Sequence, residues 1–141
     1  MTADDVTNER SVSGVWRGGM ACDVTAGEFT VRVDEPESVP GGSNTGPQPT
    51  EVFLASIASC FTLALAYSAG KRSLELDGIE VGVTGVYDGP SFSAIRIAAS
   101  IGCDIDELDR LVTAAKRVCY VTNTIRGGVP IEIAATSTRR S

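Results

Sequence analysis

A run of nineteen residues without a charge, from Val52 to Gly70, occupies the middle of the chain. Such a run is long enough to cross a membrane, and it is equally typical of a helix buried on every side. Serines and threonines interrupt it, and no aromatic belt flanks it. Pro49 and Glu51 suit the first turn of a helix, and Lys71 suits its last turn. We therefore predict a capped, buried helix and no membrane span.

The composition indicates a folded, acidic protein. The chain has 141 residues, 43 % of them hydrophobic and 21 % charged, with a net charge of -6. We predict one domain, 1–141, in which the polar residues 1–11 are mobile. The acidic balance and the lack of a Lys/Arg cluster argue against nucleic acid and against anionic membranes as partners. The polar start, MTADDVTNER, has no signal peptide and predicts a cytoplasmic location.

The chain contains no histidine, which excludes Ser/His/Asp and Cys/His nucleophiles, His-ligated zinc and axial-His haem. Four cysteines remain: Cys22, Cys60, Cys103 and Cys119. Their spacing contains no Cys-x-x-Cys pair, so a zinc site is not favoured, and we predict no metal and no cofactor. In a reducing compartment, four cysteines indicate chemistry or burial rather than structural disulfides. Any one of them alone is more often a small buried hydrophobe than a nucleophile.

Period-two alternation of apolar residues predicts several strands. It occurs over 12–16, 28–34, 79–87 and 94–103, and again over 129–136, where Val129, Ile131 and Ile133 alternate. The turn sequence Asp88-Gly89-Pro90 separates two of these strands. Between 35 and 50 the chain is rich in Pro, Gly, Ser and Asn and reads as a loop; it lacks the Gly-Lys-Ser/Thr of a P-loop.

A second helix is predicted from Asp104 to Cys119. Asp104 is a suitable N-cap and Glu107 lies three residues on, the spacing of a capping box. Residues 120–128, YVTNTIRGG, read as a turn into the last strand. The order of strands, helix, strands, helix and strand predicts the α+β class, with antiparallel sheet and segregated helices. A helix that is apolar all round needs more cover than one thin sheet provides, so we also expect an obligate dimer.

The segment GGSNTGPQPTEVFLASIASCF, followed further along by CYVTNT, resembles the OsmC/organic hydroperoxide resistance family of thiol peroxidases. The likeness covers residues 40 to 135. It depends on the Gly-Pro-x-Pro entry to the central helix, on Cys60 within that helix, and on Cys119 at the end of the second helix. The resemblance implies an intertwined homodimer, with antiparallel sheets wrapped around two central helices and an active site at each subunit interface.

The resemblance also implies a reaction cycle. Cys60 would be the peroxidatic cysteine, which attacks the O–O bond of an organic or lipid hydroperoxide and becomes a sulfenic acid. Cys119 would be the resolving cysteine, which closes an intramolecular disulfide. A dithiol of the lipoyl type, or a low-molecular-weight thiol, would then reduce the disulfide. Thiolates are the nucleophiles in such steps, and a sulfenic acid condenses readily with a nearby thiol. Cys22 and Cys103 are then structural.

In the family, an arginine held by a glutamate stabilises the peroxidatic thiolate. The resemblance makes Arg17 the candidate arginine, with Arg32 second, and Glu51 the candidate glutamate. The chain departs from the family here, because Thr50 stands where the peroxidases carry glutamate and Glu51 comes one residue later. One residue turns a helix by about 100°. The alternative is therefore a dimer of this fold without peroxidase turnover, acting as an apolar-ligand-binding or redox-sensing module.

Overall fold

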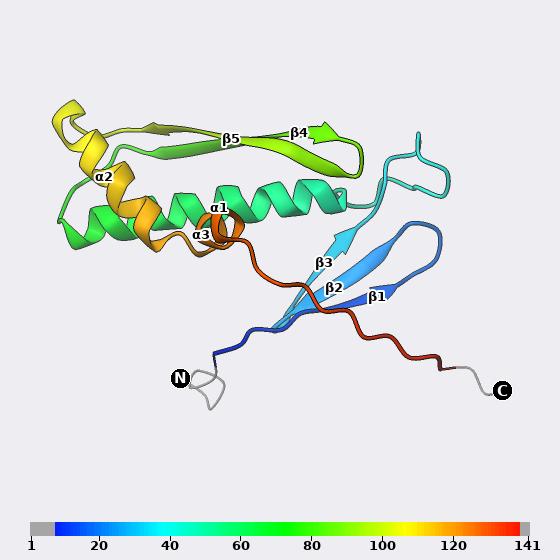
Figure 1. The fold of residues 1–141 in the computed structure, drawn as a ribbon. Helices are drawn as coiled ribbons and strands as arrows, with labels where there is room; N and C mark the ends of the chain where they lie inside the picture. Colours follow the sequence, from blue (N-terminus) through cyan, green and yellow to red (C-terminus); the bar gives the residue numbers. More distant parts are fainter. Residues whose placement is uncertain (1–7, 139–141) are drawn as a thin grey trace. The chain divides into compact units, whose positions relative to one another are not determined.

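The computed structural model describes residues 8–138 of the chain, which form two compact units. The N-terminal unit extends to Ala55 and the C-terminal unit begins at Ser56, so the boundary falls inside the long central helix. Most of the segment predicted to be mobile, 1–11, lies outside the described residues. The α+β class with antiparallel sheets is confirmed (Figure 1).

The N-terminal unit contains a three-stranded antiparallel sheet with strands in the order β1-β2-β3. These strands are β1 (Ser13–Trp16), β2 (Cys22–Ala26) and β3 (Phe29–Val33). The prediction missed β2, although Cys22, Val24 and Ala26 alternate with polar residues there. The tight turn from β2 to β3 uses Gly27 at φ +61°, a conformation that costs glycine little.

Asp34 organises the loop that follows β3. Its side chain is buried, at 1 % exposure, and it accepts four hydrogen bonds. The donors are the N–H of Glu35 at 2.7 Å, the N–H of Ser43 at 3.4 Å, and the N–H and hydroxyl of Thr45 at 3.1 and 2.6 Å. These bonds to the charged form lower the pKa of the Asp34 carboxyl to about 2, the Thr45 hydroxyl contributing most. One carboxylate thereby holds a loop that has few buried apolar residues.

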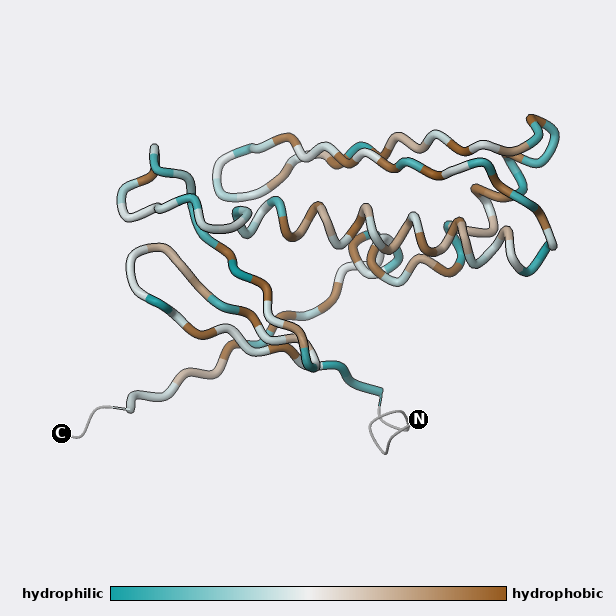
Figure 2. The backbone as a smooth tube through the Cα atoms, turned by 180° about the vertical axis from the view of Figure 1, so that it is seen from behind, coloured by the Kyte–Doolittle hydropathy of each residue, from teal (hydrophilic) through white to brown (hydrophobic). Residues whose placement is uncertain are grey.

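Helix α1 spans Pro49–Lys71 and begins at the proline, as predicted. The C-terminal unit adds the hairpin of β4 (Ile79–Asp88) and β5 (Ser91–Ile101), then α2 (Ile105–Val118) and α3 (Tyr120–Gly127). Figure 1 shows the hairpin lying along α1, with α2 crossing the C-terminal half of that helix. In Figure 2, α1 is coloured mostly white and brown, in keeping with its uncharged sequence.

The core of the C-terminal unit forms where α1 meets α2. Its fully buried residues come from both helices and from the residue after α2: Leu65, Leu111, Ala115 and Cys119, each at 0 % exposure. By length and composition α1 could cross a membrane, with a mean hydropathy of 1.8 over its most apolar window. Its contacts with this core are those expected of a core helix. One face of α1 is nevertheless exposed, with Leu63 at 68 % and Tyr67 at 57 %.

Three sequence predictions are wrong. Residues 120–127, predicted as a turn, form helix α3; Asn123 N–H bonds to the carbonyl of Cys119, and Gly128 ends the helix at φ +66°. Asp104 is the N-cap of α2, but no capping box forms, since its side chain makes no cap hydrogen bond. The predicted strand 129–136 is not a strand. A strand needs a hydrogen-bonded neighbour, and within the described residues none lies beside this segment; Ile131 is 84 % exposed.

Candidate active site

The structure brings together Cys60 and Cys119, the two cysteines that the resemblance pairs. Cys60 lies on α1, and Cys119 lies at the junction between α2 and α3. The apolar face of α2, with Leu111 and Ala115, packs into the core and places Cys119 there, fully buried. Cys60 packs against the same core and is partly exposed. Both thiols are free, and the more accessible one is Cys60.

The surroundings of Cys119 favour its thiolate. Burial opposes ionisation, but hydrogen bonds from the hydroxyl and N–H of Thr122, from the Cys60 thiol and from the N–H of Val121 outweigh it. Together they lower the pKa of the Cys119 thiol below its ordinary value. Cys119 is the N-cap of α3, and Val121 and Thr122 belong to the first turn of that helix. In this pair Cys60 is therefore the hydrogen-bond donor and Cys119 is the acceptor.

The other two cysteines lie apart from this pair along the chain. Cys22 is in β2, where it is opposite Trp16 of β1 and Val33 of β3. Cys103 follows β5 and packs, partly buried, against the core of the C-terminal unit. Among the described residues, no group of three His, Cys, Asp or Glu side chains could hold a metal ion. Cys60 is the cysteine whose thiol hydrogen-bonds to Cys119.

Arg17 and Arg32, the candidate arginines, both pair with Asp23 in the N-terminal unit. Arg17 Nε lies 3.0 Å from Asp23 Oδ2, and Arg32 Nε lies 2.6 Å from Oδ1. The bonds from Arg32 and then Arg17 lower the pKa of the Asp23 carboxyl, and the Asp23 partner raises the pKa of Arg32. Two cations and one anion leave this cluster a net charge of +1. Sequence reasoning missed Asp23, because its place opposite Arg32 is known only from the β2–β3 register.

Glu51 stabilises the start of α1. Its Oε1 accepts a hydrogen bond of 2.9 Å from the backbone N–H of Gln48, the residue before Pro49. This is the contact that a glutamate in the first turn makes with an N-cap residue. Gln48 in turn donates through its side chain to Glu35 Oε2 at 2.9 Å. Glu51 and Arg17 both belong to the N-terminal unit, and their action on the thiols stays a prediction.

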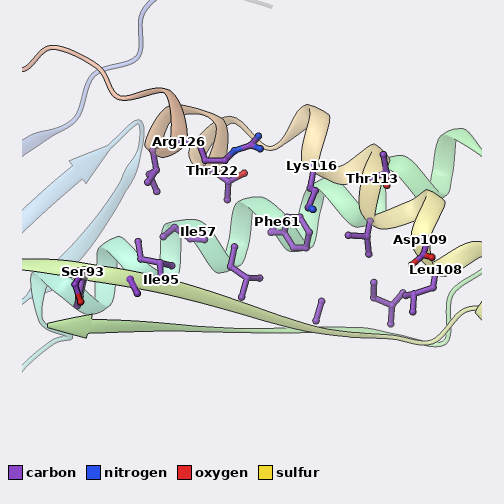
Figure 3. A pocket seen from close by; sticks show the side chains of 17 residues that line it. Ile57, Phe61, Ser93, Ile95, Leu108, Asp109, Thr113, Lys116, Thr122 and Arg126 are labelled. Carbon is purple, nitrogen blue, oxygen red and sulfur yellow. The ribbon is translucent and has the colours of Figure 1, made fainter.

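A groove of about 1100 Å³ lies within the C-terminal unit (Figure 3). Ile57 and Phe61 of α1 and the apolar side chains of β5 form one part of its wall. Helices α2 and α3 form the other, with Lys116, Thr122 and Arg126 among the lining residues. Ile57 and Phe61 flank Cys60 along α1, and Thr122 hydrogen-bonds to Cys119, so the groove lies beside the thiol pair. Cys60 does not line it.

Comparisons with known proteins place this chain in a family. The model of the family described as "OsmC-like protein" matches residues 41–134, more than half of the chain. The chain belongs to the OsmC family. The match includes α1 with Cys60, the β4–β5 hairpin, and the α2–α3 junction with Cys119. It also includes segment 129–134, which has no strand partner among the described residues.

Two of the relatives of this chain are named as organic hydroperoxide resistance proteins. The chain is 28 % identical over 124 residues to organic hydroperoxide resistance protein OhrB of Bacillus subtilis, covering 83 % of this chain and 90 % of that protein. It is 30 % identical over 108 residues to an organic hydroperoxide resistance protein of Xanthomonas axonopodis pv. citri, covering 72 % and 75 %. The crystal structure of an OsmC-like protein from Mycoplasma pneumoniae has the same fold, with a TM-score of 0.70, 16 % identity, and coverage of 85 % and 89 %.

Proposed function

We propose that this protein is a thiol-dependent peroxidase that reduces organic hydroperoxides in oxidative stress defence, with Cys60 as the peroxidatic and Cys119 as the resolving cysteine. The observation that carries the proposal is the contact between two free thiols in one core, where the accessible one is Cys60 and the buried one is Cys119. The substrate class is supported by the similarity to organic hydroperoxide resistance proteins.

The proton path of the proposed reaction uses the Cys119 thiolate. In its ionised form, Cys119 accepts the proton of Cys60, the thiol that hydrogen-bonds to it. The Cys60 sulfur then attacks the terminal oxygen of the hydroperoxide; an S–O bond forms, the O–O bond breaks, and the sulfur is oxidised to sulfenic acid. The leaving alkoxide takes the proton from Cys119 and becomes the alcohol. A chain without histidine can thus transfer the proton with sulfur alone.

The second half of the cycle forms and reduces a disulfide. The Cys119 thiolate, restored by the alkoxide, attacks the Cys60 sulfenic acid; an S–S bond forms, and hydroxide leaves and is protonated to water. A dithiol of the lipoyl type then returns two electrons and two protons to the pair. We propose that it attacks the Cys60 sulfur, because Cys60 is accessible and the thiolate released from Cys119 is stabilised by its neighbours.

Arg17 is our candidate for the cation that stabilises the Cys60 thiolate. The pair with Asp23 fixes the direction of its Nε–H, and the cluster of Arg17, Arg32 and Asp23 keeps a net positive charge. Glu51 is the second candidate from the N-terminal unit, through its place in the first turn of α1. Arg17→Gln should slow alkylation of Cys60 at neutral pH, whereas Arg32→Gln, which removes the same charge from the same cluster, should slow it less.

A homodimer in the cytoplasm is part of this proposal. Leu63 and Tyr67 expose an apolar face of α1, and Ile131 and Ile133 are exposed in a segment with strand-like alternation, at 84 % and 90 %. A second copy of the chain would cover such surfaces and supply a strand neighbour. Sedimentation at submicromolar concentration should give twice the mass of the chain; a folded monomer there would exclude the dimer.

The direct test of the function is turnover of cumene hydroperoxide with a dithiol reductant. The proposal predicts that Cys60→Ser abolishes turnover, and that Cys119→Ser, which also loses the base for Cys60, consumes one equivalent of peroxide more slowly and stops at the sulfenic acid. Cys103→Ser is the matched control, since Cys103 touches the same core, and it should keep its turnover. Full activity in Cys60→Ser would disprove the proposal.

A non-catalytic module is the second candidate, and two observations favour it. Glu51 is engaged at the start of α1, and Thr50 stands at the position where the resemblance expects glutamate. Alkylation of Cys60 against pH separates the two functions. A thiol that reacts only well above neutral pH, near the usual pKa of about 8.5, would favour the module; rapid alkylation at neutral pH would favour the peroxidase.

A further inference from the structure

The C-terminal unit has a second, smaller hollow, and three arginines line it. Its volume is about 320 Å³, at the lower end of the range for small-molecule sites. The lining residues are Arg72, Asp109, Arg110, Thr113, Ala114 and Arg117. Asp109 and Thr113 also line the groove beside the thiols, whereas the three arginines line only the smaller hollow.

Two helices supply the arginines. Arg110, Ala114 and Arg117 follow one another in α2 at spacings of four and three residues, so they lie on one side of that helix. Ala114 is small and leaves space between the two long side chains. Arg72 is the residue after the last residue of α1, and Figure 1 shows α2 crossing the C-terminal half of α1. Three guanidinium groups therefore border one hollow.

The charge of this hollow is opposite in sign to that of the whole chain. Within the described part of the C-terminal unit, the ion pair present joins Arg110 to Glu107 at 3.8 Å, and neither Arg72 nor Arg117 takes part in it. Asp109 is the acid in the lining. Three guanidinium groups and one carboxylate give the lining a net charge of +2, in a chain of net charge -6. Counting Glu107 as well leaves the hollow positive.

Stabilisation of the helix ends does not account for these arginines. A cation in the last turn of a helix interacts favourably with the helix dipole, and Lys71 in α1 and Lys116 in α2 are placed to do so. An arginine follows each lysine, and in both cases it is the arginine that lines the hollow. Arginine differs from lysine in its planar fork of donors, which can bind two oxygens of one phosphate.

We propose that this hollow binds the phosphate group of a small phosphate monoester. Arg72 and Arg117 are the main donors to the phosphate oxygens, and the Thr113 hydroxyl is a further donor. Charge selects this occupant, because a phosphate monoester carries about -1.5 to -2 at neutral pH and the lining carries +2. The volume selects a monoester over a free phosphate ion, which would fill only part of the hollow. Binding here does not rest on the proposed peroxidase function.

The first test is calorimetric titration with phenyl phosphate at fixed ionic strength. Arg72→Gln and Arg117→Gln should each weaken binding roughly fivefold to tenfold, the loss of a charge-assisted hydrogen bond at an exposed position. Arg117→Lys keeps the charge but loses the planar fork, so it should weaken binding as well. Asp109→Asn removes the acid from the lining and should strengthen binding.

Lys71→Gln and Lys116→Gln are the matched controls. Each removes the same charge from the residue before an arginine of the hollow, and neither lysine lines the hollow. Both variants should change the affinity by less than about twofold, because water and salt screen their charge. An equal loss in the lysine and arginine variants would overturn the proposal, since it would show general attraction of anions and no built site.

The second test compares ligands that differ in charge and size. Phenyl sulfate has the shape of phenyl phosphate and a single charge, and it should bind roughly tenfold more weakly. Inorganic phosphate should also bind more weakly than phenyl phosphate. Equal affinities for phenyl phosphate and phenyl sulfate would overturn the match to a dianion, and inorganic phosphate that binds as tightly as phenyl phosphate would overturn the monoester.

A third test separates a soluble monoester from a lipid headgroup. The protein should stay in solution when vesicles that contain phosphatidic acid are sedimented. Sedimentation with the vesicles that is lost in Arg117→Gln would assign the hollow to a membrane lipid and overturn the soluble ligand. A folded protein that does not bind phenyl phosphate at low ionic strength would overturn the site altogether.

Discussion

The N-terminal unit places a carboxylate at its most buried position, whereas the C-terminal unit places apolar side chains and a thiol there. Asp34 is 1 % exposed and orders its loop through four hydrogen bonds. Leu65, Leu111 and Cys119 are all 0 % exposed and order theirs by packing. The stability of the N-terminal unit therefore depends on the protonation of Asp34, and that of the C-terminal unit depends on the volume of its buried side chains. The charged candidate residues Arg17 and Asp23 belong to the N-terminal unit, whereas the thiols of Cys60 and Cys119 belong to the C-terminal unit.

The largest expected effect is on the thiols of the C-terminal unit. Cys60→Ala should reduce peroxide turnover to the rate of free reductant, because Cys60 is the partly exposed thiol that hydrogen-bonds to Cys119. Asp23→Asn, in the N-terminal unit, should lower kcat while leaving peroxide consumption measurable, since it affects the direction of Arg17 and not the reacting sulfur. Coupled consumption of a dithiol measures both. An equal loss of turnover in Cys60→Ala and Asp23→Asn would contradict the assignment of Cys60 as the reacting group and of Asp23 as a group that only positions Arg17.

The next effect concerns volume in the core of the C-terminal unit. Leu111→Ala should lower the free energy of unfolding by about 2–5 kcal/mol, the usual cost of removing a buried leucine side chain and leaving a cavity. Leu63→Ala is the matched control, because Leu63 lies on the same unit but is 68 % exposed. Urea unfolding measures both. A loss in Leu63→Ala as large as in Leu111→Ala would indicate that the exposed face of α1 is covered in the assembled protein.

A pH effect is expected from the N-terminal unit. The pKa of Asp34 is about 2 in the folded chain, below its ordinary value of 3.8. The carboxylate therefore contributes stability that is fully present above about pH 3.8 and is lost as the pH falls through about 2. Asp34→Asn should lower Tm by roughly 5–10 °C at neutral pH and should remove this part of the acid dependence. Glu37→Gln, an exposed acid in the same loop, should do neither.

The smallest expected effect is that of the arginine cluster on stability. Arg17 and Arg32 are 54 % and 39 % exposed in their side chains, and exposed ion pairs contribute little because water and salt screen them. Arg17→Gln should therefore change Tm by less than about 2 °C while slowing alkylation of Cys60. A shift in Tm as large as that of Asp34→Asn would show that Arg17 is structural.

Much of the fold follows from local sequence patterns. Pro49 and the uncharged run predicted α1, and alternation with Asp88-Gly89-Pro90 predicted the β4–β5 hairpin. Both signals depend on neighbouring residues. Helix α3 was missed because Thr122 and Asn123 also favour turns. The structure shows a helix there, with a backbone hydrogen bond from Asn123 N–H to the carbonyl of Cys119. The segment 129–136 has the alternation of a strand, but pairing depends on a neighbour that no local pattern supplies.

For the candidate site, too, the sequence predicted some features and missed others. The motifs around Cys60 and Cys119 predicted two cysteines, and the structure shows that they are in contact in one core. The sequence could not predict that Asp23 pairs with both arginines, because this depends on the register of β2 against β3. Nor could it predict that Glu51 bonds to Gln48, since a carboxylate in a first helical turn has several possible partners.

The most direct measurement of the central claim is the intact mass and thiol count of the protein before and after one equivalent of cumene hydroperoxide, followed by peptide mapping. The account predicts a rapid loss of two thiols and two hydrogens, with a disulfide that links the peptides of Cys60 and Cys119, while Cys22 and Cys103 stay free. Four free thiols after minutes of exposure, or a disulfide that involves Cys22 or Cys103, would contradict it.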